Sequence, residues 1–389
     1  MIWTTIHTLD IILWLFTACS VAYVALYALI YLFHWKKHGL TQTEESSVKT
    51  KFLVLYPAYR EDKVIVNSIK TFLQQDYPAD RYHLVVISDH QKRATNESLS
   101  LLPITLLKPN FMKSSKAKAL QHAIECNNEQ YDYVVILDAD NVVEPNFLSL
   151  LNDITQRGYK AIQCHRCAKN SDSAISILDG ISEEINNTLF RKSHNIIGLS
   201  SALIGSGMCF SYPWFKDNVA NLSTAGEDRE LEVLLLKQDI YIKYAEHIPV
   251  FDEKVSNEEN FQRQRQRWMS AQVHCLLSML PYLPKAFIKG NINFIDKTIQ
   301  QMLIPRSMLV VCTFAMSLLA SVIAPWWSLK WWALFLVTCL SLLFAVPYKM
   351  YSKSIPSTLT ILPKLTWKML KNLRHIDHKN KEFLHTKHE

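Results

Sequence analysis

A long apolar stretch near the N-terminus constrains the fold of this chain more than any other feature. Residues Ile11 to Phe33 read IILWLFTACSVAYVALYALIYLF and contain no charged side chain. Such a run exceeds the roughly 20 residues that a helix needs to cross a bilayer. No basic residue precedes the run and no small-residue cleavage site follows it, so we interpret it as a membrane anchor and not as a signal peptide. Lys36 and Lys37 follow directly, which predicts an external N-terminus and a cytoplasmic chain beyond them.

Two further apolar runs lie near the other end of the chain. Ser307 to Trp327 and Trp331 to Tyr348 are joined by the short segment Ser328 to Lys330. Tryptophans surround this joint, as is typical of a membrane–water interface: Trp326, Trp327, Trp331 and Trp332. Arg306 precedes the pair and lysines follow it, so we expect both outer ends to be cytoplasmic. Because the second run is marginal in length, a buried hairpin remains an alternative.

The charge balance is compatible with a protein that lies against anionic lipid. The net charge is +7, and we expect no nucleic-acid partner. The tail segment Met369 to Lys381, MLKNLRHIDHKNK, is basic enough to rest on a headgroup surface. An ordinary solvated helix face explains the same charges equally well.

Cysteine usage points to free thiols in a cytoplasmic domain. Of the 8 cysteines, Cys164 and Cys167 form one CxxC without a second pair, and a structural zinc site needs four ligands. We therefore expect no disulfide framework. His165 has no evident partner ligand in the sequence, so we interpret it as structural.

The middle of the chain alternates short apolar runs with amphipathic stretches. The predicted strands are Lys51–Pro57, His83–Asp89, Tyr133–Asp140 and Lys160–His165, and the predicted helices are Asp62–Gln75, Lys116–Asn128 and Glu227–Gln238. Strands that are almost wholly apolar and alternate with helices indicate an α/β fold with a mostly parallel sheet, covered on both faces.

Acidic residues follow these strands. Asp138 and Asp140 come directly after the apolar run Val134 to Leu137, and alternation along an extended chain predicts that their carboxylates point the same way. They form either a solvated turn or a cation site. Asp89 ends another strand, and in parallel sheets ligands bind beyond the carboxyl ends of the strands. Oxygen ligands favour Mg²⁺ or Mn²⁺ over zinc.

The usual phosphate-binding loops are missing from the sequence. It contains no GxxxxGK[ST], and the GSG at Gly205 to Gly207 lacks the spacing and context of a dinucleotide fingerprint. A phosphate-bearing ligand would therefore be held by a cation and by basic side chains.

Five motifs in order give the chain a specific resemblance. They are PAYRED (57–62), SKAKAL (115–120), DAD (138–140), GEDRELEVLLL (226–236) and QRQRW (264–268). Over about residues 50 to 275 the chain resembles the family 2 glycosyltransferases, specifically the membrane-bound branch with cellulose, chitin and hyaluronan synthases. The resemblance implies a GT-A type nucleotide-sugar-binding domain with a mostly parallel sheet, one N-terminal transmembrane helix and two C-terminal ones. Arg60 and Ser115 replace the family's usual Asn and Gly, and three spans are fewer than processive synthases have.

Carried over by position, the resemblance implies a role for each motif. The roles are a turn that meets the nucleoside (Pro57, Tyr59, Glu61), an acid that reads uracil or ribose (Asp89), a diphosphate contact (Lys116), a metal-binding D-x-D pair that also faces the donor (Asp138, Asp140), a catalytic base (Asp228, with Glu227 as the next candidate) and contacts to the diphosphate and the acceptor sugar (Gln264, Arg267, Trp268). We expect Asp140 to be the direct metal ligand.

Structural alternatives stay open for several of these assignments. Asp89 can cap a turn, Asp228 can be an ordinary helix-start acid, and Trp268 can belong to the core. Lys113 or Lys118 can take the place of Lys116, and the basic residues around Gln264 can form a lipid-facing strip.

The implied domains follow the motifs. They are a transmembrane anchor (1–50), a cytoplasmic GT-A domain (51–283), an interfacial helix region (284–306), two transmembrane helices (307–349) and a basic cytoplasmic tail (350–389). We expect an integral protein of the bacterial inner membrane.

The expected activity is an inverting, metal-dependent hexosyl transfer from a UDP-sugar, with Mg or Mn as the metal. The acceptor is a growing polysaccharide or a lipid-linked saccharide, and the enzyme adds sugars either processively or singly. Homo-oligomerisation or association with other polysaccharide-assembly proteins is compatible with this activity. An alternative of another class is a non-catalytic, nucleotide-sugar-binding regulatory membrane protein.

Overall fold

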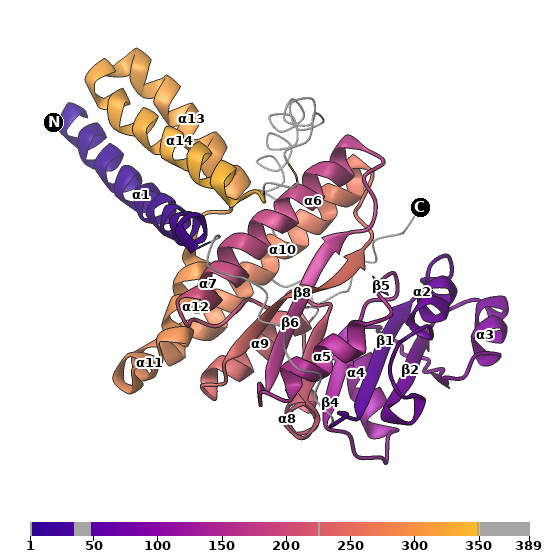
Figure 1. Ribbon diagram of the computed structural model, residues 1–389. Coiled ribbons are helices and arrows are strands. Elements are labelled where there is room, and N and C mark those ends of the chain that lie inside the picture. The colour runs from indigo at the N-terminus through magenta and orange to yellow at the C-terminus, as the bar shows by residue number, and fades with distance from the viewer. Residues whose placement is uncertain (1, 35–47, 225, 348–349, 351–389) are drawn as a thin grey trace.

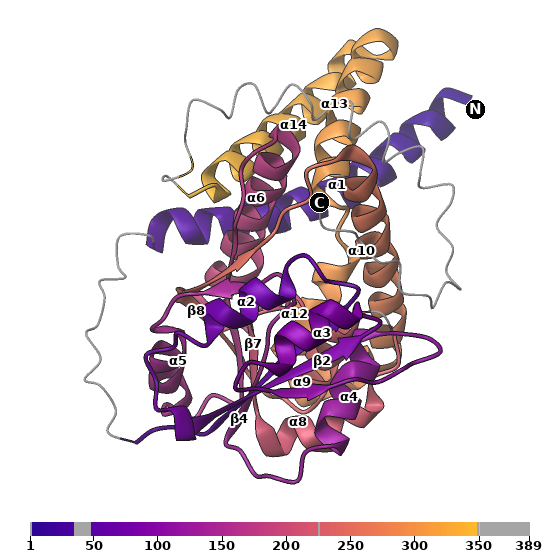
Figure 2. The ribbon, with the colours of Figure 1, turned by 90° about the vertical axis from the view of Figure 1, so that its right-hand side faces the viewer.

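The computed structural model describes residues 2–34, 48–224, 226–347 and 350. The described chain forms an α/β part and a group of three long apolar helices (Figure 1). A second view shows the same separation, with the long helices above the sheet and helices α6 and α10 running between the two parts (Figure 2).

One mixed sheet organises the α/β part. Its strands are β1 (Phe52–Tyr59), β2 (Tyr82–Asp89), β3 (Thr105–Leu107), β4 (Tyr133–Ile136), β5 (Val142–Val143), β6 (Ala161–Ala168), β7 (Met208–Ser211) and β8 (Ile242–Asp252). They lie in the order β3-β2-β1-β4-β7-β6-β8-β5. Strands β1 to β4 are mutually parallel, whereas β7 is antiparallel to both β4 and β6. β6 and β8 therefore run in the same direction as β4.

The prediction of a mostly parallel α/β sheet is confirmed, but the sequence analysis missed four of its strands, β3, β5, β7 and β8. β5 is a second antiparallel strand, at the edge of the sheet. β7 is only four residues long, which is too short for a periodic pattern to be visible. β8 has a register shift opposite Cys164 and His165, which interrupts regular alternation.

Helices cover both faces of this sheet. They are α2 (Ile65–Phe72), α3 (Arg93–Ser100), α4 (Lys116–Glu125), α5 (Phe147–Thr155), α6 (Ala174–Asn187), α7 (Ser193–Ile196), α8 (Tyr212–Asn218), α9 (Glu227–Lys237), α10 (Glu258–Met279), α11 (Leu283–Lys289) and α12 (Ile292–Met302). Two apolar cores result, one joining α4 and α9 to the sheet and the other joining α2 and α5 to it. The predicted helices around α2 and α4 end earlier than expected, at Phe72 and Glu125.

Three helices are long and apolar enough to cross a membrane: α1 (Ile2–His34), α13 (Arg306–Ile323) and α14 (Pro325–Ala345). They pack on one another, and α1 also contacts α7. The predicted joint at Ser328 to Lys330 is wrong, because the chain turns at Ala324 and those residues belong to α14. Asp10 of α1 pairs with Lys330 and accepts a hydrogen bond from Trp331, which ties the two helices together. The predicted tail helix face lies outside the described residues.

Candidate active site

The D-A-D segment lies on a turn and not on a strand. β4 ends at Ile136, and Asn141 closes the turn that follows by accepting a hydrogen bond from the Asp138 amide at 2.9 Å. The expectation of an extended chain through these acids is therefore wrong, although both of them line one cavity. The Asp138 side chain is 32% exposed in the site, whereas Asp140 is buried and accepts a hydrogen bond from the Glu253 amide at 2.9 Å.

Lys116 lies between the acids of two different motifs. Its ammonium nitrogen is 2.5 Å from Asp138 Oδ1 and 3.3 Å from Glu227 Oε1, and it also donates to the Gly205 carbonyl oxygen. Burial alone would lower the pKa of Lys116, but the charges of Asp138 and Glu227 raise it above its ordinary value. Lys116 is thus a fixed cation at neutral pH.

Local structure explains why Lys116 and not a neighbour takes this place. Ser115 is the N-cap of α4 and accepts a hydrogen bond from the Lys118 amide, which makes Lys116 the first helical residue. Lys118 is exposed and donates to the Lys113 carbonyl oxygen instead. The serine that replaces the family's glycine is therefore a helix cap.

Glu227 and Asp228 begin helix α9, where the helix dipole favours negative charge. Both face the loop at Gly205, at which an added Cβ would lie 3.8 Å from Glu227 Oε1 and 3.7 Å from Asp228 Oδ2. Gly205 has a φ of +80°, so this close approach uses a backbone conformation that glycine readily adopts. Burial raises the pKa of Glu227 to about 7, with Lys116 opposing and Asp228 adding to the shift.

The ends of β1 and β2 meet at the same edge of the sheet. Tyr59 pairs with Asp89, and the Asp89 carboxylate is buried with His90 Nδ1 at 2.6 Å. Arg60 has a φ of +56°, a conformation in which asparagine is several-fold enriched among residues with side chains. Its guanidinium lies over the Tyr59 ring. The family's usual asparagine at this position thus suits the backbone better than the arginine of this chain.

The QRQRW segment belongs to α10, and its Gln264, Arg267 and Trp268 line the same cavity as these acids. Burial lowers the pKa of Arg267, and the charges of Glu227, Asp228 and Asp138 oppose that shift. Gln264 Oε1 is buried and has no hydrogen-bond partner among the described residues. The neighbouring Arg265 lies over the Trp268 ring, 4.7 Å from its centroid.

One cavity of about 1350 Å³ joins all these elements. Every residue to which the sequence assigned a role lines it: Pro57, Tyr59, Glu61, Asp89, Lys116, Asp138, Asp140, Glu227, Asp228, Gln264, Arg267 and Trp268. The volume exceeds the roughly 300–1,000 Å³ of ordinary ligand pockets. The cavity therefore has room for more than one substrate.

Sequence reasoning missed Asp252, the last residue of β8, and Glu253, which follows it; both line the cavity that the D-A-D turn also lines. Asn141 Nδ2 bridges the two strand ends, at 3.2 Å from Asp140 Oδ1 and 3.3 Å from Asp252 Oδ1. The sequence did contain a signal for these two acids. They follow an apolar run, as Asp138 and Asp140 do.

The sequence profile of Glycosyl transferase family group 2 matches residues 133–350. This stretch runs from the D-A-D strand to the end of the long apolar helices and includes more than half of the chain. The chain belongs to this family.

Two similar proteins are consistent with the family. The probable glycosyltransferase YdaM of Bacillus subtilis (strain 168) is 29% identical over 115 residues, which cover 26% of this chain and 27% of that protein. The mannosyltransferase PcManGT of Pyrobaculum calidifontis, solved with GDP-Man and Mn²⁺, superposes with a TM-score of 0.51 at 15% identity and covers 85% of this chain and 97% of its own. The second likeness confirms the GT-A-like fold of this glycosyltransferase.

The acidic end of the cavity fits a divalent cation. Asp138 and Asp140 offer hard oxygen donors, the kind that Mg²⁺ and Mn²⁺ prefer. The hydroxyl of Tyr56 is buried near Asp140 and has no hydrogen-bond partner in the described part of the chain. The two carboxylates, with this hydroxyl beside them, therefore fit a divalent cation.

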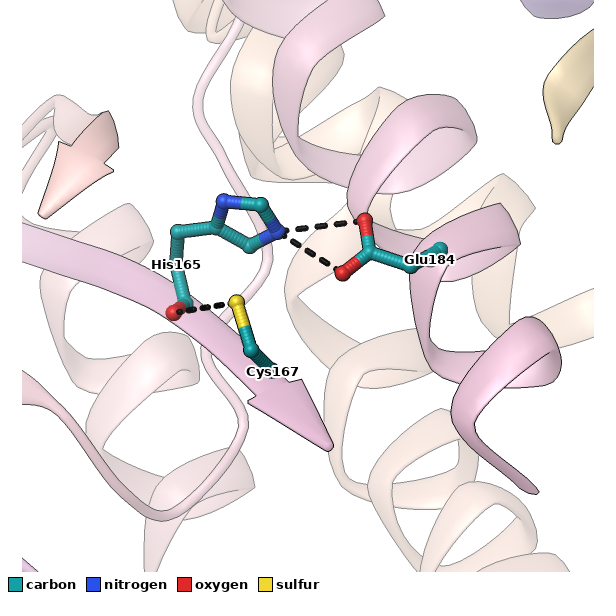
Figure 3. Close-up of side chains that lie close together, drawn as sticks. All are labelled: His165, Cys167 and Glu184. Atoms are coloured by element: carbon teal, nitrogen blue, oxygen red, sulfur yellow. Dashed lines mark hydrogen bonds and ion pairs between the residues drawn. The ribbon is translucent and has the colours of Figure 1, made fainter. Parts of the chain in front are cut away.

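A second cluster in the glycosyltransferase domain consists of His165 and Cys167 on β6 and Glu184 on α6 (Figure 3). Their ligand-type atoms all lie within 4.8 Å of one another. Burial alone would lower the pKa of His165, but hydrogen bonds with Cys167 and Glu184 raise it to about 10. Both ring nitrogens already face acceptors, since Nδ1 lies 3.0 Å from the Glu246 carbonyl oxygen and Nε2 lies 2.9 Å from Glu184 Oε1. We therefore interpret this cluster as an ion pair between sheet and helix, and the expectation that His165 lacks a partner is wrong.

Proposed function

We propose that this family 2 glycosyltransferase is a membrane-anchored, inverting enzyme. It transfers a hexose from a UDP-sugar to a growing polysaccharide or a lipid-linked saccharide. The observation that carries the proposal is the cavity itself, because it unites acids, cations and an aromatic ring from motifs scattered over the chain.

The proposed chemistry is a single displacement at the anomeric carbon of the donor. The acceptor oxygen forms a bond to that carbon while the bond to the diphosphate oxygen breaks, and UDP leaves with the electron pair. Asp228 takes the acceptor proton as general base, and Glu227, whose pKa is close to neutral, is the alternative base. One displacement from the opposite side inverts the anomeric configuration.

Positive side chains stabilise the charge that develops on UDP. Arg267 presents a planar fork that matches phosphate oxygens, and Lys116 supplies a point charge. Asp138 and Asp140 would hold a divalent metal, Mg or Mn, which supplies further neutralisation of the diphosphate. Pro57, Tyr59, Glu61 and Asp89 bind the nucleoside, and Gln264 assists at the diphosphate. Trp268 provides a flat face on which the acceptor sugar is held in line.

The orientation that we propose puts the reaction on the cytoplasmic face, because Lys36 and Lys37 follow the first apolar run in the sequence. α1, α13 and α14 anchor the chain, with the N-terminus outside. Labels at the N-terminus and near Ala324 should then react with an impermeant reagent in intact cells, and a label at Asn96 should react only after lysis. Labelling of Asn96 in intact cells contradicts the orientation.

Release of UDP tests the proposed activity directly. The full-length protein in detergent micelles is incubated with a panel of UDP-sugars and Mn²⁺, with and without a membrane lipid extract. We expect one sugar to give UDP release that depends on the extract. Asp228→Asn is the matched control. If a UDP-sugar binds but none is consumed, the non-catalytic alternative is favoured.

A further inference from the structure

The cavity does not end at the catalytic residues but continues between helices of the membrane part. Its far end is lined by side chains of α13 and α14 that are mostly apolar: Val310, Phe314, Phe335, Cys339, Leu342 and Leu343. Helix α6 forms the third wall through Ile181 and Ile185. One continuous space therefore has an ionic end and an apolar end.

The apolar end includes large side chains that are partly exposed in the described chain. Phe314 is 42% exposed and Leu343 is 47% exposed, although both line the cavity. Such surfaces are costly in water and are favourable against hydrocarbon. A prenyl or acyl chain can enter this arm from the bilayer without crossing the polar part of the domain.

Two arginines meet where the ionic and apolar ends join. Arg265 Nη2 and Arg306 Nη2 each donate to the Ser182 hydroxyl, at 3.3 Å in both cases. Both arginines and Ser182 line the cavity. Two guanidinium groups that share one hydroxyl repel each other unless an anion lies close.

The described neighbours neutralise only part of this charge. Arg265 pairs with Asp179 at 2.7 Å. The hydrogen-bond acceptors of Arg306 among the described residues are neutral, namely the Ser182 carbonyl and hydroxyl and Asn186 Oδ1. The Nε of Arg265 is buried and has no hydrogen-bond partner in the described part of the chain. One net positive charge and one unused donor remain at the junction.

We propose that the acceptor is a phosphate-bearing lipid, whose chain lies between α6, α13 and α14 and whose phosphate lies between Arg265 and Arg306. Guanidinium forks bind phosphate in two-point contacts, and an apolar surrounding strengthens them. Arg265 also lies over Trp268, so a sugar attached to this phosphate would lie next to the ring that we propose holds the acceptor sugar. This inference rests on the proposed function and narrows its acceptor to the lipid-linked class.

Binding is measured apart from transfer, so that the two proposals fail separately. Native mass spectrometry of the full-length protein in micelles gives affinities for farnesyl phosphate, farnesol, dioleoyl phosphatidylglycerol and inorganic phosphate, without any sugar donor. We expect farnesyl phosphate to bind at least tenfold more tightly than farnesol or free phosphate. Tighter binding of phosphatidylglycerol than of farnesyl phosphate also supports a lipid phosphate and identifies its source as a glycerolipid.

Matched variants test each part of the site. Arg265→Gln and Arg306→Gln should each weaken farnesyl phosphate binding by roughly 10- to 100-fold, the range for lost charge-assisted hydrogen bonds, with unchanged UDP affinity. Arg93→Gln, on the exposed side chain of α3, is the charge control. Val310→Trp should block the apolar arm, whereas Val322→Trp, which is 84% exposed on the same helix, should not.

Three results would overturn the inference. The first is farnesyl phosphate that binds no more tightly than farnesol. The second is farnesyl phosphate that binds Arg265→Gln and Arg306→Gln as tightly as it binds the unaltered protein, which makes the arginines a structural tie between α6, α10 and α13. The third is inorganic phosphate that binds as tightly as farnesyl phosphate, which rules out a contribution of the lipid chain. If a variant does not fold, the lipid series on the unaltered protein and Val310→Trp still decide the question. If the unaltered protein binds farnesyl phosphate but turns over no UDP-sugar, the proposed function is refuted and the lipid site is not.

Discussion

Glu183 and Glu227 are both buried glutamates of the same domain, but their surroundings differ. Glu183 accepts from Arg166 at 3.1 Å and from Arg191 at 3.0 Å, with Lys254 at 4.0 Å. Burial would raise its pKa, but these three cations hold it well below the ordinary value. Glu227 pairs with Lys116 at 3.3 Å, and burial raises its pKa to about 7.

The count of charges explains the difference. Around Glu183 two carboxylates, with Asp252 as the second, meet three cations, so every acid is fully neutralised. At the other cluster Asp138, Glu227 and Asp228 meet Lys116 and Arg267. That cluster keeps an excess of negative charge in an open cavity. We infer that the closed cluster holds the structure together, whereas the open one is available for a proton and a metal.

Removal of metal should have the largest effect, because it acts only on the open cluster. EDTA should abolish sugar transfer, and Mn²⁺ or Mg²⁺ should restore it. The reason is that the cation that Asp138 and Asp140 would hold neutralises the diphosphate of the donor. Turnover is measured as UDP release. Thermal unfolding followed by tryptophan fluorescence should not change on EDTA addition. Full activity in the chelator would refute the metal assignment.

The next largest effect should come from Asp228→Asn. This change keeps the size of the side chain but removes the proton acceptor, so transfer should fall by roughly 10²- to 10⁴-fold while UDP affinity stays near wild type. Arg267→Ala should instead weaken UDP binding and also slow transfer. Calorimetric UDP affinities beside turnover rates separate the two. If Asp228→Asn transfers normally at saturating donor, Glu227→Gln is the variant to measure.

Glu183→Gln should unfold the protein more readily, because it leaves buried arginines without their counter-charge. We expect a loss of about 3–5 kcal/mol in the free energy of unfolding, the usual cost of breaking a buried ion pair. Glu227→Gln is the matched control and should change the free energy of unfolding much less, because Lys116 still pairs with Asp138. Equal losses in the two variants would contradict the distinction between a closed and an open cluster.

The smallest effect should come from the His165–Glu184 pair. The folded pKa of His165, about 10, lies above the ordinary value near 6.5. Its contribution to stability is therefore complete below about pH 6.5 and is lost as the pH rises through about 10. Between pH 7 and pH 10.5 the wild type should lose about 1–2 kcal/mol more than His165→Asn, as measured by denaturant unfolding. Equal pH dependence in both proteins would show that His165 is not protonated in the fold.

Features that depend on neighbouring residues in the chain were predictable from the sequence. The three apolar helices follow from uninterrupted hydrophobic runs, and the parallel strands from short apolar segments between amphipathic ones. The motifs also identified residues that line the cavity, because each motif is a short segment whose chemistry is visible locally. The cap that Ser115 forms on α4 also depends only on neighbouring residues in the chain.

Features that depend on distant contacts were decided by the tertiary structure alone. Asp140 is buried and accepts a hydrogen bond from the Glu253 amide, which directly follows β8, whereas Asp138 remains partly exposed; no local pattern distinguishes the two. Glu183 and Glu227 have opposite pKa shifts because different numbers of cations arrive from other elements. Arg265 and Arg306 converge on Ser182 only because α6, α10 and α13 meet there. Burial and charge both depend on what packs nearby in space, and a linear sequence does not record that packing.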